Sequence, residues 1–268
     1  MKHSPIRAAV TASALADACT GCRTAAPLPF GFTMAFQPIV DIVTGGVFAY
    51  EALVRGTEGQ SAGEILGRIS PAMIYKFDQA CRVKAIGLAG HLFTGDDTAR
   101  LSINFMPDAV YEPDACIRAS LAAAYRAGFD PTRLMFEFTE NEPMRDIAHV
   151  RRIIASYRSR GFTTAIDDFG AGYAGLSMLA DLRPDLLKLD MGLVRGIDTC
   201  LARQEIVAGI VRIATALGIA CIAEGVETAA ELASLREIGI RLCQGFFLAK
   251  PAFEALPEIT YRDEYGDQ

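Results

Sequence analysis

The stretch FTMAFQPIVDIVTGGVFAYEALVR, residues 32–55, decides the fold of this chain. It contains two strand-like apolar runs, at 32–42 and 47–55, joined only by DIVTGGV, with a tight Thr-Gly-Gly turn at 44–46. A parallel crossover needs roughly a dozen residues or more, so a connection this short suits a hairpin. We therefore expect the first strand to run antiparallel to the second.

Beyond this hairpin, strand-like runs alternate with helical stretches. The further strands are predicted at 99–105, 133–138, 163–169, 185–190, 219–224 and 242–248. Helices are predicted at 65–92, with Pro71 as a break or a start, and at 113–128, 144–161, 200–218 and 228–239. Eight strands alternating with helices over about 220 residues match a (β/α)8 barrel. The predicted fold is an α/β, modified TIM (β/α)8 barrel with an antiparallel first strand; a doubly wound open sheet is the alternative.

Composition limits the protein classes that remain. The chain has 268 residues, of which 51% are hydrophobic, which is enough for one large domain with a substantial core. Its net charge is −6 without a block of Lys and Arg, which argues against a protein that coats a DNA or RNA duplex. No apolar run approaches the roughly 18 residues of a membrane span. Lys2 and Arg7 before an Ala-rich run faintly resemble a signal peptide, but Asp17 argues against one, so we expect a cytoplasmic protein without membrane insertion.

Residues 1–30 look separate from the domain at 31–268. They are Ala-rich and end in APLPFG, so we expect an arm or linker. This arm contains the pair Cys19 and Cys22, which is a redox switch, half of a zinc site, or two incidental thiols. Five of the seven cysteines fall in apparent core segments and suggest small buried residues in a reducing compartment: Cys81, Cys116, Cys200, Cys221 and Cys243.

Nearly every parallel strand of this barrel would end on a polar side chain, at the face where barrel enzymes place their active sites. A cap or a surface charge explains any one of these, but not acids embedded in apolar runs such as MFEF and AIDDF. Burying an unpaired carboxylate is costly, so such groups must be neutralised, paired or metal-bound. The expected rim is Glu51 ending the second strand, Asn104 the third, Glu137 the fourth, Asp167 and Asp168 the fifth, Lys188 and Asp190 the sixth and Glu224 the seventh, with Gln244 inside the last strand.

The donor types point to a hard divalent metal. Carboxylates and an Asn carbonyl suit Mg²⁺ or Mn²⁺, with Ca²⁺ a looser fit. Adjacent Asp167 and Asp168 could bridge two ions about 3.5–4 Å apart, the spacing of two-metal hydrolysis. Zn²⁺ is a poor match because the three histidines lie outside every motif: His3, His91 and His149.

The loop after Asp168 also matches two patterns that we reject. Gly170, Gly172 and Gly175 form a G-x-G-x-x-G run, but two aspartates precede it and would repel a pyrophosphate, and no Rossmann-type unit surrounds it. The DFG triplet lacks the other kinase motifs. A flexible Gly-rich loop that closes over metals and substrate fits better.

At these residues the chain resembles the EAL-domain family of cyclic di-GMP phosphodiesterases. The resemblance covers about 32–255, where many short motifs occur in the family's order: FQPIVD, EALVR, SINF, FEFTE, IDDFGAGYAGLSML, LLKLD, IAEGVE and CQGFFLAKP. The family fold, a barrel with an antiparallel first strand, agrees with the expected hairpin. The domain at 31–268 would then be an EAL phosphodiesterase domain.

The resemblance implies a role for each matched residue. Glu51, Asn104, Glu137 and Asp167 would bind one metal, and Asp167, Asp168 and Glu224 a second, with Asp167 shared. Lys188 would hold the nucleophilic water. Glu224 is also viewed as the general base that takes a proton from this water. The alternative is a hydroxide held between the two metals, which would need no protein base. Glu224, Lys188 and Glu51 are thus the expected catalytic set. The substrate would be contacted, or the site supported, by Gln37, Arg55 and Gln244. Glu140 would tether the loop that contains Gly170 and Gly172. Two further acids, Asp190 and Glu227, would support the site.

Since none of these groups is missing, the resemblance favours a working enzyme. The expected reaction is metal-assisted in-line attack that opens cyclic di-GMP to linear pGpG, with two Mg²⁺ or Mn²⁺ ions as cofactors and Ca²⁺ binding but inhibiting. The alternatives are a receptor that binds cyclic di-GMP without turnover and an interaction module that ignores it. The family also implies a homodimer, through helices that the sequence does not identify.

Overall fold

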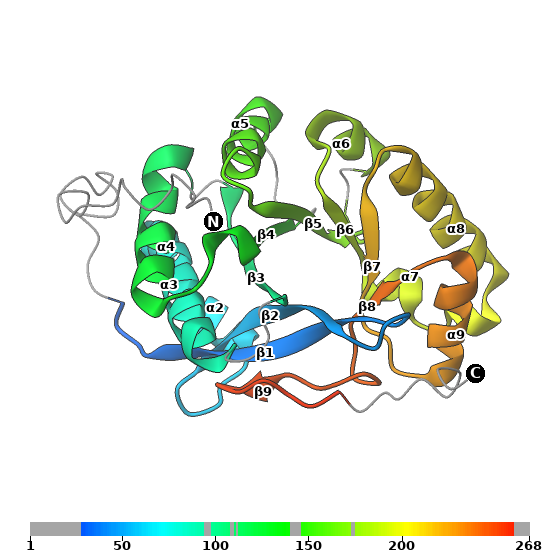
Figure 1. Cartoon of the computed structure of the whole chain (residues 1–268), viewed down its shortest axis with the longest axis horizontal. Coiled ribbons are helices and arrows are strands. Elements are labelled where there is room, and N and C mark those ends of the chain that lie inside the picture. Colours follow the sequence, from blue (N-terminus) through cyan, green and yellow to red (C-terminus); the bar gives the residue numbers. More distant parts are fainter. Residues whose placement is uncertain are drawn as a thin grey trace, which may run out of the picture.

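The computed structural model describes residues 28–93, 98–107, 110, 112–139, 146–172 and 175–259. Their centre is a barrel in which the strands follow the order β2-β3-β4-β5-β6-β7-β8-β1, closed by pairing of β1 with β2 and extended on the outside by β9. Helices surround the strands (Figure 1). The predicted α/β barrel with an antiparallel first strand is confirmed. The arm with Cys19 and Cys22 lies outside the described residues.

The predicted hairpin is confirmed. Strand β1 (Phe32–Asp41) pairs antiparallel with β2 (Val47–Gly56) along almost its whole length, with one irregularity between Ile39 and Val40. Gly45 turns the chain with φ at +70°, a conformation that a side chain would oppose. The Asp41 carboxylate accepts hydrogen bonds from the Val43 and Thr44 amides at 3.0 and 3.3 Å and so fixes the turn.

The remaining barrel strands are parallel, and their register brings their carboxyl ends to one rim. Asn104, for example, lies beside Glu137 in neighbouring strands, and Thr139 lies beside Asp167. These strands are β3 (Arg100–Asn104), β4 (Leu134–Thr139), β5 (Thr163–Phe169), β6 (Leu186–Leu189), β7 (Ala220–Ala223) and β8 (Leu242–Cys243).

The last strand is shorter than predicted. The expected run at 242–248 ends as β8 at Cys243, so Gln244 follows the strand instead of lying within it. The chain turns there because Gly245 passes close to the backbone of Val226, and the amides of Leu248 and Ala249 both donate to the Gly245 carbonyl. An additional strand, β9 (Ala252–Phe253), then pairs antiparallel with β1.

The predicted helices are present, with one split and two additions. The stretch at 65–92 divides at Pro71 into α2 (Ala62–Leu66), a 3-10 turn η3 (Pro71–Met73) and α3 (Ile74–Leu92). The short helices α6 (Gly175–Leu182) and α7 (Met191–Val194) are additions to the predicted set. The others are α4 (Pro113–Ala127), α5 (Ile147–Arg158), α8 (Leu201–Ala216) and α9 (Ala229–Ile238), with 3-10 turns η5 (Pro131–Arg133) and η6 (Ile197–Thr199).

Two apolar clusters form the core. The larger fills the space between the strands and the surrounding helices. The smaller contains one residue from each of seven strands: Ile39, Ala49, Met135, Ala165, Leu186, Ile222 and Leu242. Because side chains alternate between the two faces of a strand, this smaller cluster is a layer inside the barrel.

The described cysteines are free thiols. Cys116 and Cys243 are buried as expected, whereas Cys81, Cys200 and Cys221 are only partly buried, which corrects that part of the expectation. Burial nonetheless raises the pKa of Cys221 to about 11 and that of Cys243 to about 12, which disfavours the reactive thiolate. Among the described helices, none combines the length and apolar character that crossing a membrane requires.

Candidate functional site

The site is the polar layer directly above the apolar layer inside the barrel. Each residue of the apolar layer is two positions along its strand from a polar residue, so both point inward. Ala49 leads to Glu51, for example, and Leu186 leads to Lys188. The full polar layer is Gln37, Glu51, Glu137, Asp167, Lys188, Glu224 and Gln244. Parallel register and period-two alternation therefore bring together residues that are up to about 200 positions apart in the chain.

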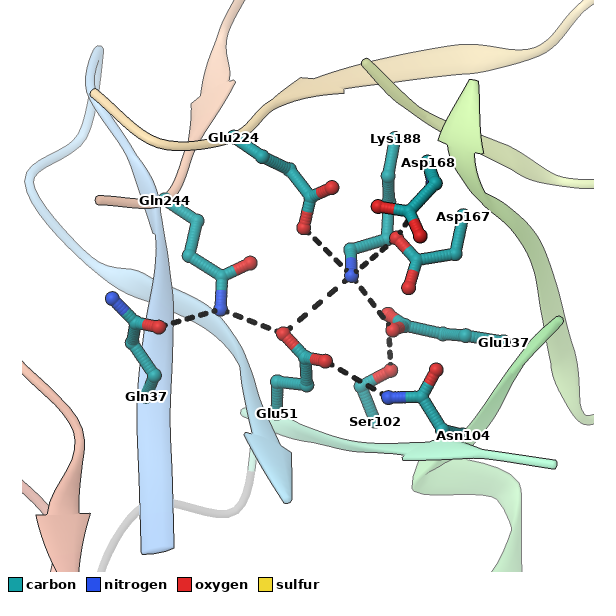
Figure 2. A network of polar contacts seen from close by, with 10 residues as sticks. All are labelled: Gln37, Glu51, Ser102, Asn104, Glu137, Asp167, Asp168, Lys188, Glu224 and Gln244. Atoms are coloured by element: carbon teal, nitrogen blue, oxygen red, sulfur yellow. Dashed lines mark hydrogen bonds and ion pairs between the residues drawn. The ribbon is translucent and has the colours of Figure 1, made fainter. Parts of the chain in front are cut away.

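Lys188 occupies the centre of this layer (Figure 2). Its fully buried ammonium lies 2.8 Å from carboxylate oxygens of Glu137, Asp167 and Glu224, and 3.5 Å from Glu51. Four carboxylates thus share one cation. If all are ionised, three negative charges remain uncompensated in a buried space, a strong attraction for a further cation.

Neutral donors hold Glu51 from two sides. Asn104 donates to one Glu51 oxygen at 2.9 Å, and Gln244 donates to the other at 2.8 Å. Gln244 also contacts the Gln37 oxygen at 3.4 Å, and Gln37 in turn donates to the Ala249 carbonyl at 3.1 Å. This chain fixes the Glu51 carboxylate in one orientation before any ligand enters.

The pKa values reflect burial opposed by Lys188. Burial raises the pKa of Glu137 to about 8 against the lowering effect of Lys188, and Glu51 and Asp167 add to the rise. Burial also raises the pKa of Glu224 well above its ordinary range. For Lys188, burial alone would lower the pKa, but the surrounding carboxylates raise it well above the ordinary value, so the lysine stays charged. Acids with raised pKa values around one ammonium mark this layer as the candidate functional site.

The donor set fits divalent metals. Two groups of acids each bring one oxygen per residue within 4.8 Å of one another: Glu51 with Glu137 and Asp167, and Asp167 with Asp168 and Glu224. Asp167 belongs to both groups, as a ligand shared by two ions would. Asp168 has φ at +55°, an unfavourable backbone angle for a residue with a side chain, and repulsion by Asp167 and Asp190 adds to burial in raising its pKa. Hard oxygen donors at this density match Mg²⁺ or Mn²⁺.

The rim opens into a pocket of about 340 Å³ lined by the acids, Gln37, Gln244 and Phe246. Phe246 also lines a neighbouring pocket of about 560 Å³, which contains Arg55 and Lys250. The expected substrate contacts Gln37 and Gln244 therefore lie with the acids, whereas Arg55 lies in the adjoining pocket. Asp190 and Glu227 also line the acidic pocket.

Two expected strand positions are corrected. Glu51 does not end β2, which continues to Gly56, because the antiparallel partner β1 extends the strand beyond the short β3. Gln244 follows β8, as described above. Gly170 and Gly172 come directly after β5 as expected, whereas Glu140 lies outside the described residues.

Two residues of the site were not among the expected ones. The buried Ser102 hydroxyl donates to Glu137, and it is the serine of the SIN motif, where alternation with Asn104 could have indicated it. Arg195 lines the acidic pocket and forms an ion pair with Glu227. It lies five positions after Asp190, beyond the short helix α7, so no strand pattern points to it.

Comparisons with known proteins agree on the same stretch of chain. The EAL domain family model matches residues 30–251. The chain is 32% identical to the blue light- and temperature-regulated antirepressor BluF of Escherichia coli over 231 residues, 86% of this chain and 57% of that protein. It is also 32% identical to the cyclic di-GMP phosphodiesterase NbdA of Pseudomonas aeruginosa over 232 residues, 81% of this chain and 28% of that protein. The chain thus spans little more than half of the first relative's length and less of the second's.

Solved structures share the fold over a similar range. The cyclic di-GMP-bound form of a standalone versatile EAL protein from Vibrio cholerae has a TM-score of 0.83 and 49% identity, and the match covers 87% of this chain and 97% of that one. The manganese and cyclic di-GMP complex of BlrP1 from Klebsiella pneumoniae at pH 9.0 has a TM-score of 0.80 and 38% identity, and the match covers 88% of this chain and 60% of that one.

Proposed function

The chain belongs to the EAL domain family, and from this membership we propose that it is a metal-dependent phosphodiesterase that hydrolyses cyclic di-GMP to linear pGpG. The observation that carries the proposal is the completeness of the polar layer. Each metal-binding acid, the asparagine and the lysine expected of an active member is present, and four of the acids converge on one ammonium. NbdA, a relative whose name states this activity, supports the reaction.

The acids would hold two Mg²⁺ or Mn²⁺ ions. Glu51, Asn104, Glu137 and Asp167 would bind one ion, and Asp167, Asp168 and Glu224 the other. Bound there, the ions would supply an activated water and neutralise charge on the phosphodiester. Related BlrP1 complexes contain manganese or calcium together with cyclic di-GMP, which supports a divalent site.

The chain's own residues would position the reacting groups. Lys188, fixed by its carboxylate partners, would orient the nucleophilic water and place positive charge beside the attacked phosphodiester. Glu224 would accept a proton from that water as the general base. Gln37 and Gln244 hold Glu51 in place, so that the layer needs little rearrangement when substrate binds.

The two pockets that meet at Phe246 suit an elongated dinucleotide. The acidic pocket would take the scissile phosphodiester with its ions, and the neighbouring pocket supplies Arg55 and Lys250 for the second phosphate. The Lys250 ammonium lies 5.7 Å from the centre of the Phe246 ring, which keeps it close to the boundary between the pockets.

The decisive experiment incubates the protein with cyclic di-GMP and Mg²⁺, Mn²⁺ or Ca²⁺ in parallel and separates the nucleotides chromatographically. We expect pGpG with Mg²⁺ and Mn²⁺, and binding without turnover with Ca²⁺. The Glu51→Ala variant removes a ligand and should form no pGpG; near-wild-type turnover by this variant would show that the metal assignment is wrong.

The alternative is a catalytically silent receptor that regulates a protein partner. The similarity to BluF, which is described as an antirepressor, favours this second candidate. It predicts tight cyclic di-GMP binding without pGpG under any of the three metals, and that result would replace the enzyme with the receptor.

We also propose a homodimer, formed through the outer face of α8. Ile206, Ile213 and Leu217 expose 51%, 36% and 40% of their surface there. Between them lies Gly209, where an added Cβ would meet nothing within 4 Å, so no contact among the described residues explains a residue that weakens the helix. Two antiparallel α8 helices that cross at Gly209 would bury this face and place Glu205 of each beside Arg212 of the other.

The expected compartment is the cytoplasm, which the free thiols of the described residues support. The phosphodiesterase unit is proposed to extend over 31–268, with 1–30 as an arm.

A further inference from the structure

Arg195 is the feature of the cleft that the proposed chemistry leaves unused. It follows α7, and it is the cationic residue among the side chains that line the acidic pocket in the described part of the chain. The residues around it are acids intended for metal, namely Asp168 and Glu224, and two further acids, Asp190 and Glu227. A guanidinium at the mouth of such a pocket does nothing for metal binding, because it repels cations.

The side chain is only partly satisfied by the chain itself. One terminal nitrogen of Arg195 forms an ion pair with Glu227, and both side chains remain accessible, at 38% and 42% exposure. The Arg195 Nε is shielded from solvent and lacks a hydrogen-bond acceptor among the described residues. An unpaired shielded donor costs free energy, so the ion pair with Glu227 leaves this guanidinium incompletely satisfied.

A buried glutamate fixes the two segments that carry this pair. Glu231 on α9 is 3% exposed. One of its oxygens accepts from the Gly196 amide at 2.8 Å, and the other accepts from the Glu227 and Thr228 amides at 2.9 and 3.1 Å. Glu231 thus fastens the backbone next to Arg195 to the backbone of Glu227. Such support from buried hydrogen bonds is what a preorganised recognition site requires.

The chemistry of the pair matches one nucleobase. Guanine presents two acceptors, O6 and N7, to an arginine fork, while its N1–H and N2–H₂ donate to a carboxylate. Adenine offers a donor, N6–H₂, where guanine has O6, so it opposes the arginine. An exposed arginine and an exposed carboxylate side by side at the mouth of the cleft therefore select guanine over adenine.

We propose that Arg195 and Glu227, positioned by Glu231, recognise one guanine base of the cyclic dinucleotide and determine base specificity. This inference rests on the proposed function, because it takes the ligand to be cyclic di-GMP. The base enters beside the metal-binding acids, Arg195 binds its O6 and N7 edge, and Glu227 accepts from the adjacent edge that carries N1–H and N2–H₂. The pair is not catalytic, since it touches the base and not the reacting phosphodiester.

The test compares Arg195→Ala and Arg195→Lys with a matched control, Arg203→Ala. Arg203 lies nearby on α8 and donates to the Gly192 carbonyl at 3.2 Å, but it does not line the acidic pocket. Each variant is assayed with cyclic di-GMP, with cyclic di-AMP, and with bis(p-nitrophenyl) phosphate, a phosphodiester without a base. Binding of cyclic di-GMP in Ca²⁺ is measured by calorimetry, which does not depend on turnover.

For Arg195→Ala we expect kcat/KM for cyclic di-GMP to fall about 10- to 100-fold, mainly through KM. Calorimetry should show Kd rising by a similar factor, while hydrolysis of bis(p-nitrophenyl) phosphate stays unchanged. Preference for cyclic di-GMP over cyclic di-AMP should fall as well. Arg195→Lys should not restore that preference, because an ammonium has the charge without the fork. Arg203→Ala should behave as wild type.

Other outcomes would overturn the inference. Equal losses on all three phosphodiesters would mean that Arg195 only supports the fold, and an unchanged Kd for cyclic di-GMP would mean that it does not touch the base. In both cases the proposed function stands if the wild type produces pGpG. A wild type that neither binds nor hydrolyses cyclic di-GMP would overturn the proposed function itself and this inference with it. A wild type that binds without hydrolysis leaves the calorimetric comparison of the variants as the deciding result.

Discussion

At the scale of single residues, Lys188 is what allows a buried acidic layer to exist before metal binds. The ammonium is within 2.8 Å of three carboxylates and 3.5 Å of a fourth, and it occupies the space between the two groups of potential metal ligands. A divalent ion entering this layer competes with the lysine for the same oxygens. Lys188 therefore neutralises part of the acidic layer in the metal-free protein and, under the proposed function, would act as a positioning cation once metal binds.

A Lys188→Met variant separates these two roles. Removing one partner from a buried charge cluster typically costs about 3–5 kcal/mol, so the metal-free variant should unfold at a clearly lower temperature than wild type in EDTA. Mg²⁺ should then stabilise the variant more than the wild type, because the acids have lost their other cation. Turnover should fall by about 100-fold or more, while cyclic di-GMP binding weakens far less.

The control for this change is Lys84→Met, an exposed lysine on α3, which should leave both melting temperature and turnover within error. If the metal-free Lys188→Met protein were as stable as wild type, the four carboxylates would not depend on the ammonium. The account of the layer would then be wrong.

At the scale of elements, the turn after β8 depends on one glycine. An added Cβ at Gly245 would come 2.1 Å from the Val226 oxygen and 2.3 Å from its nitrogen, and these backbone atoms cannot move aside cheaply. The same turn sets the position of Gln244, whose amide donates to Glu51 at 2.8 Å. The close packing of Gly245 against Val226 thus affects the site through the hydrogen bond from Gln244 to Glu51.

Gly245→Ala should therefore destabilise the protein by about 2 kcal/mol or more and lower turnover as well. Its matched control is Gly87→Ala on α3, where nothing lies within 4 Å of an added Cβ. That substitution should stabilise the protein by about 0.5–1 kcal/mol, the usual preference for Ala over Gly inside a helix. Denaturant unfolding measures both, and similar values for the two variants would contradict the packing argument.

The β1–β2 turn carries a pH-dependent contact. Asp41 accepts from Arg241 Nε at 2.7 Å, and this bond, with the Val43 and Thr44 amides, holds the pKa of Asp41 below its ordinary value of 3.8 against the opposing effect of burial. A carboxyl whose pKa is lower in the folded state than in the unfolded state stabilises the fold at pH values above the unfolded-state pKa. That stabilisation is lost as the pH falls through the folded-state pKa.

Asp41→Asn keeps an acceptor for the two turn amides but removes the ion pair with Arg241. Because the Arg241 side chain is 58% exposed, solvent screens the pair, and we expect only a small loss in the free energy of unfolding at pH 7. The difference from wild type should shrink as the pH falls below 3.8, where the Asp41 carboxyl of the unfolded chain takes up a proton, and should vanish below the lower pKa of the folded state. A difference that stays constant from pH 7 to pH 3 would exclude a charge effect.

At the scale of the whole molecule, the charges on α8 make the proposed dimer testable. In the antiparallel arrangement, Glu205 of each copy faces Arg212 of the other, so either Glu205→Arg or Arg212→Glu places like charges together. Each single variant should weaken the dimer about tenfold or more, and the double variant should restore it. Sedimentation velocity over a range of concentrations measures the association.

Arg126→Glu is the control, because it makes the same charge change at an exposed position on α4. It should leave the dimer unchanged. If both single variants dimerise as well as wild type, α8 is not the interface.

Much of this molecule could be predicted from local patterns. The turn at 44–46 predicts the antiparallel first strand, because a connection of that length permits no crossover. Alternation with period two places Glu137 inside β4 and Asp167 inside β5, and the repeated strand–helix rhythm brings their strand ends to one rim. These features depend on neighbours in the chain, so sequence spacing carries them.

Other features depend on contacts between distant segments. The extension of β2 beyond Glu51 follows from pairing with β1, and the early end of β8 follows from the approach of Gly245 to Val226. Arg195 enters the cleft because Glu231, 36 positions further along the chain, holds the adjacent amide. No local sequence pattern indicates a contact between residues so far apart in the chain.

By itself, then, the sequence determined the barrel, the reversed first strand and the set of acids at its rim, because strand periodicity and connection length are local properties. Only the tertiary structure decided that four of those acids share the Lys188 ammonium, that the Ser102 hydroxyl donates to Glu137, and that Arg195 lines the acidic pocket. The physical reason is that burial and charge neutralisation depend on which side chains meet in space. Closure of the barrel determines which side chains from distant strands come into contact.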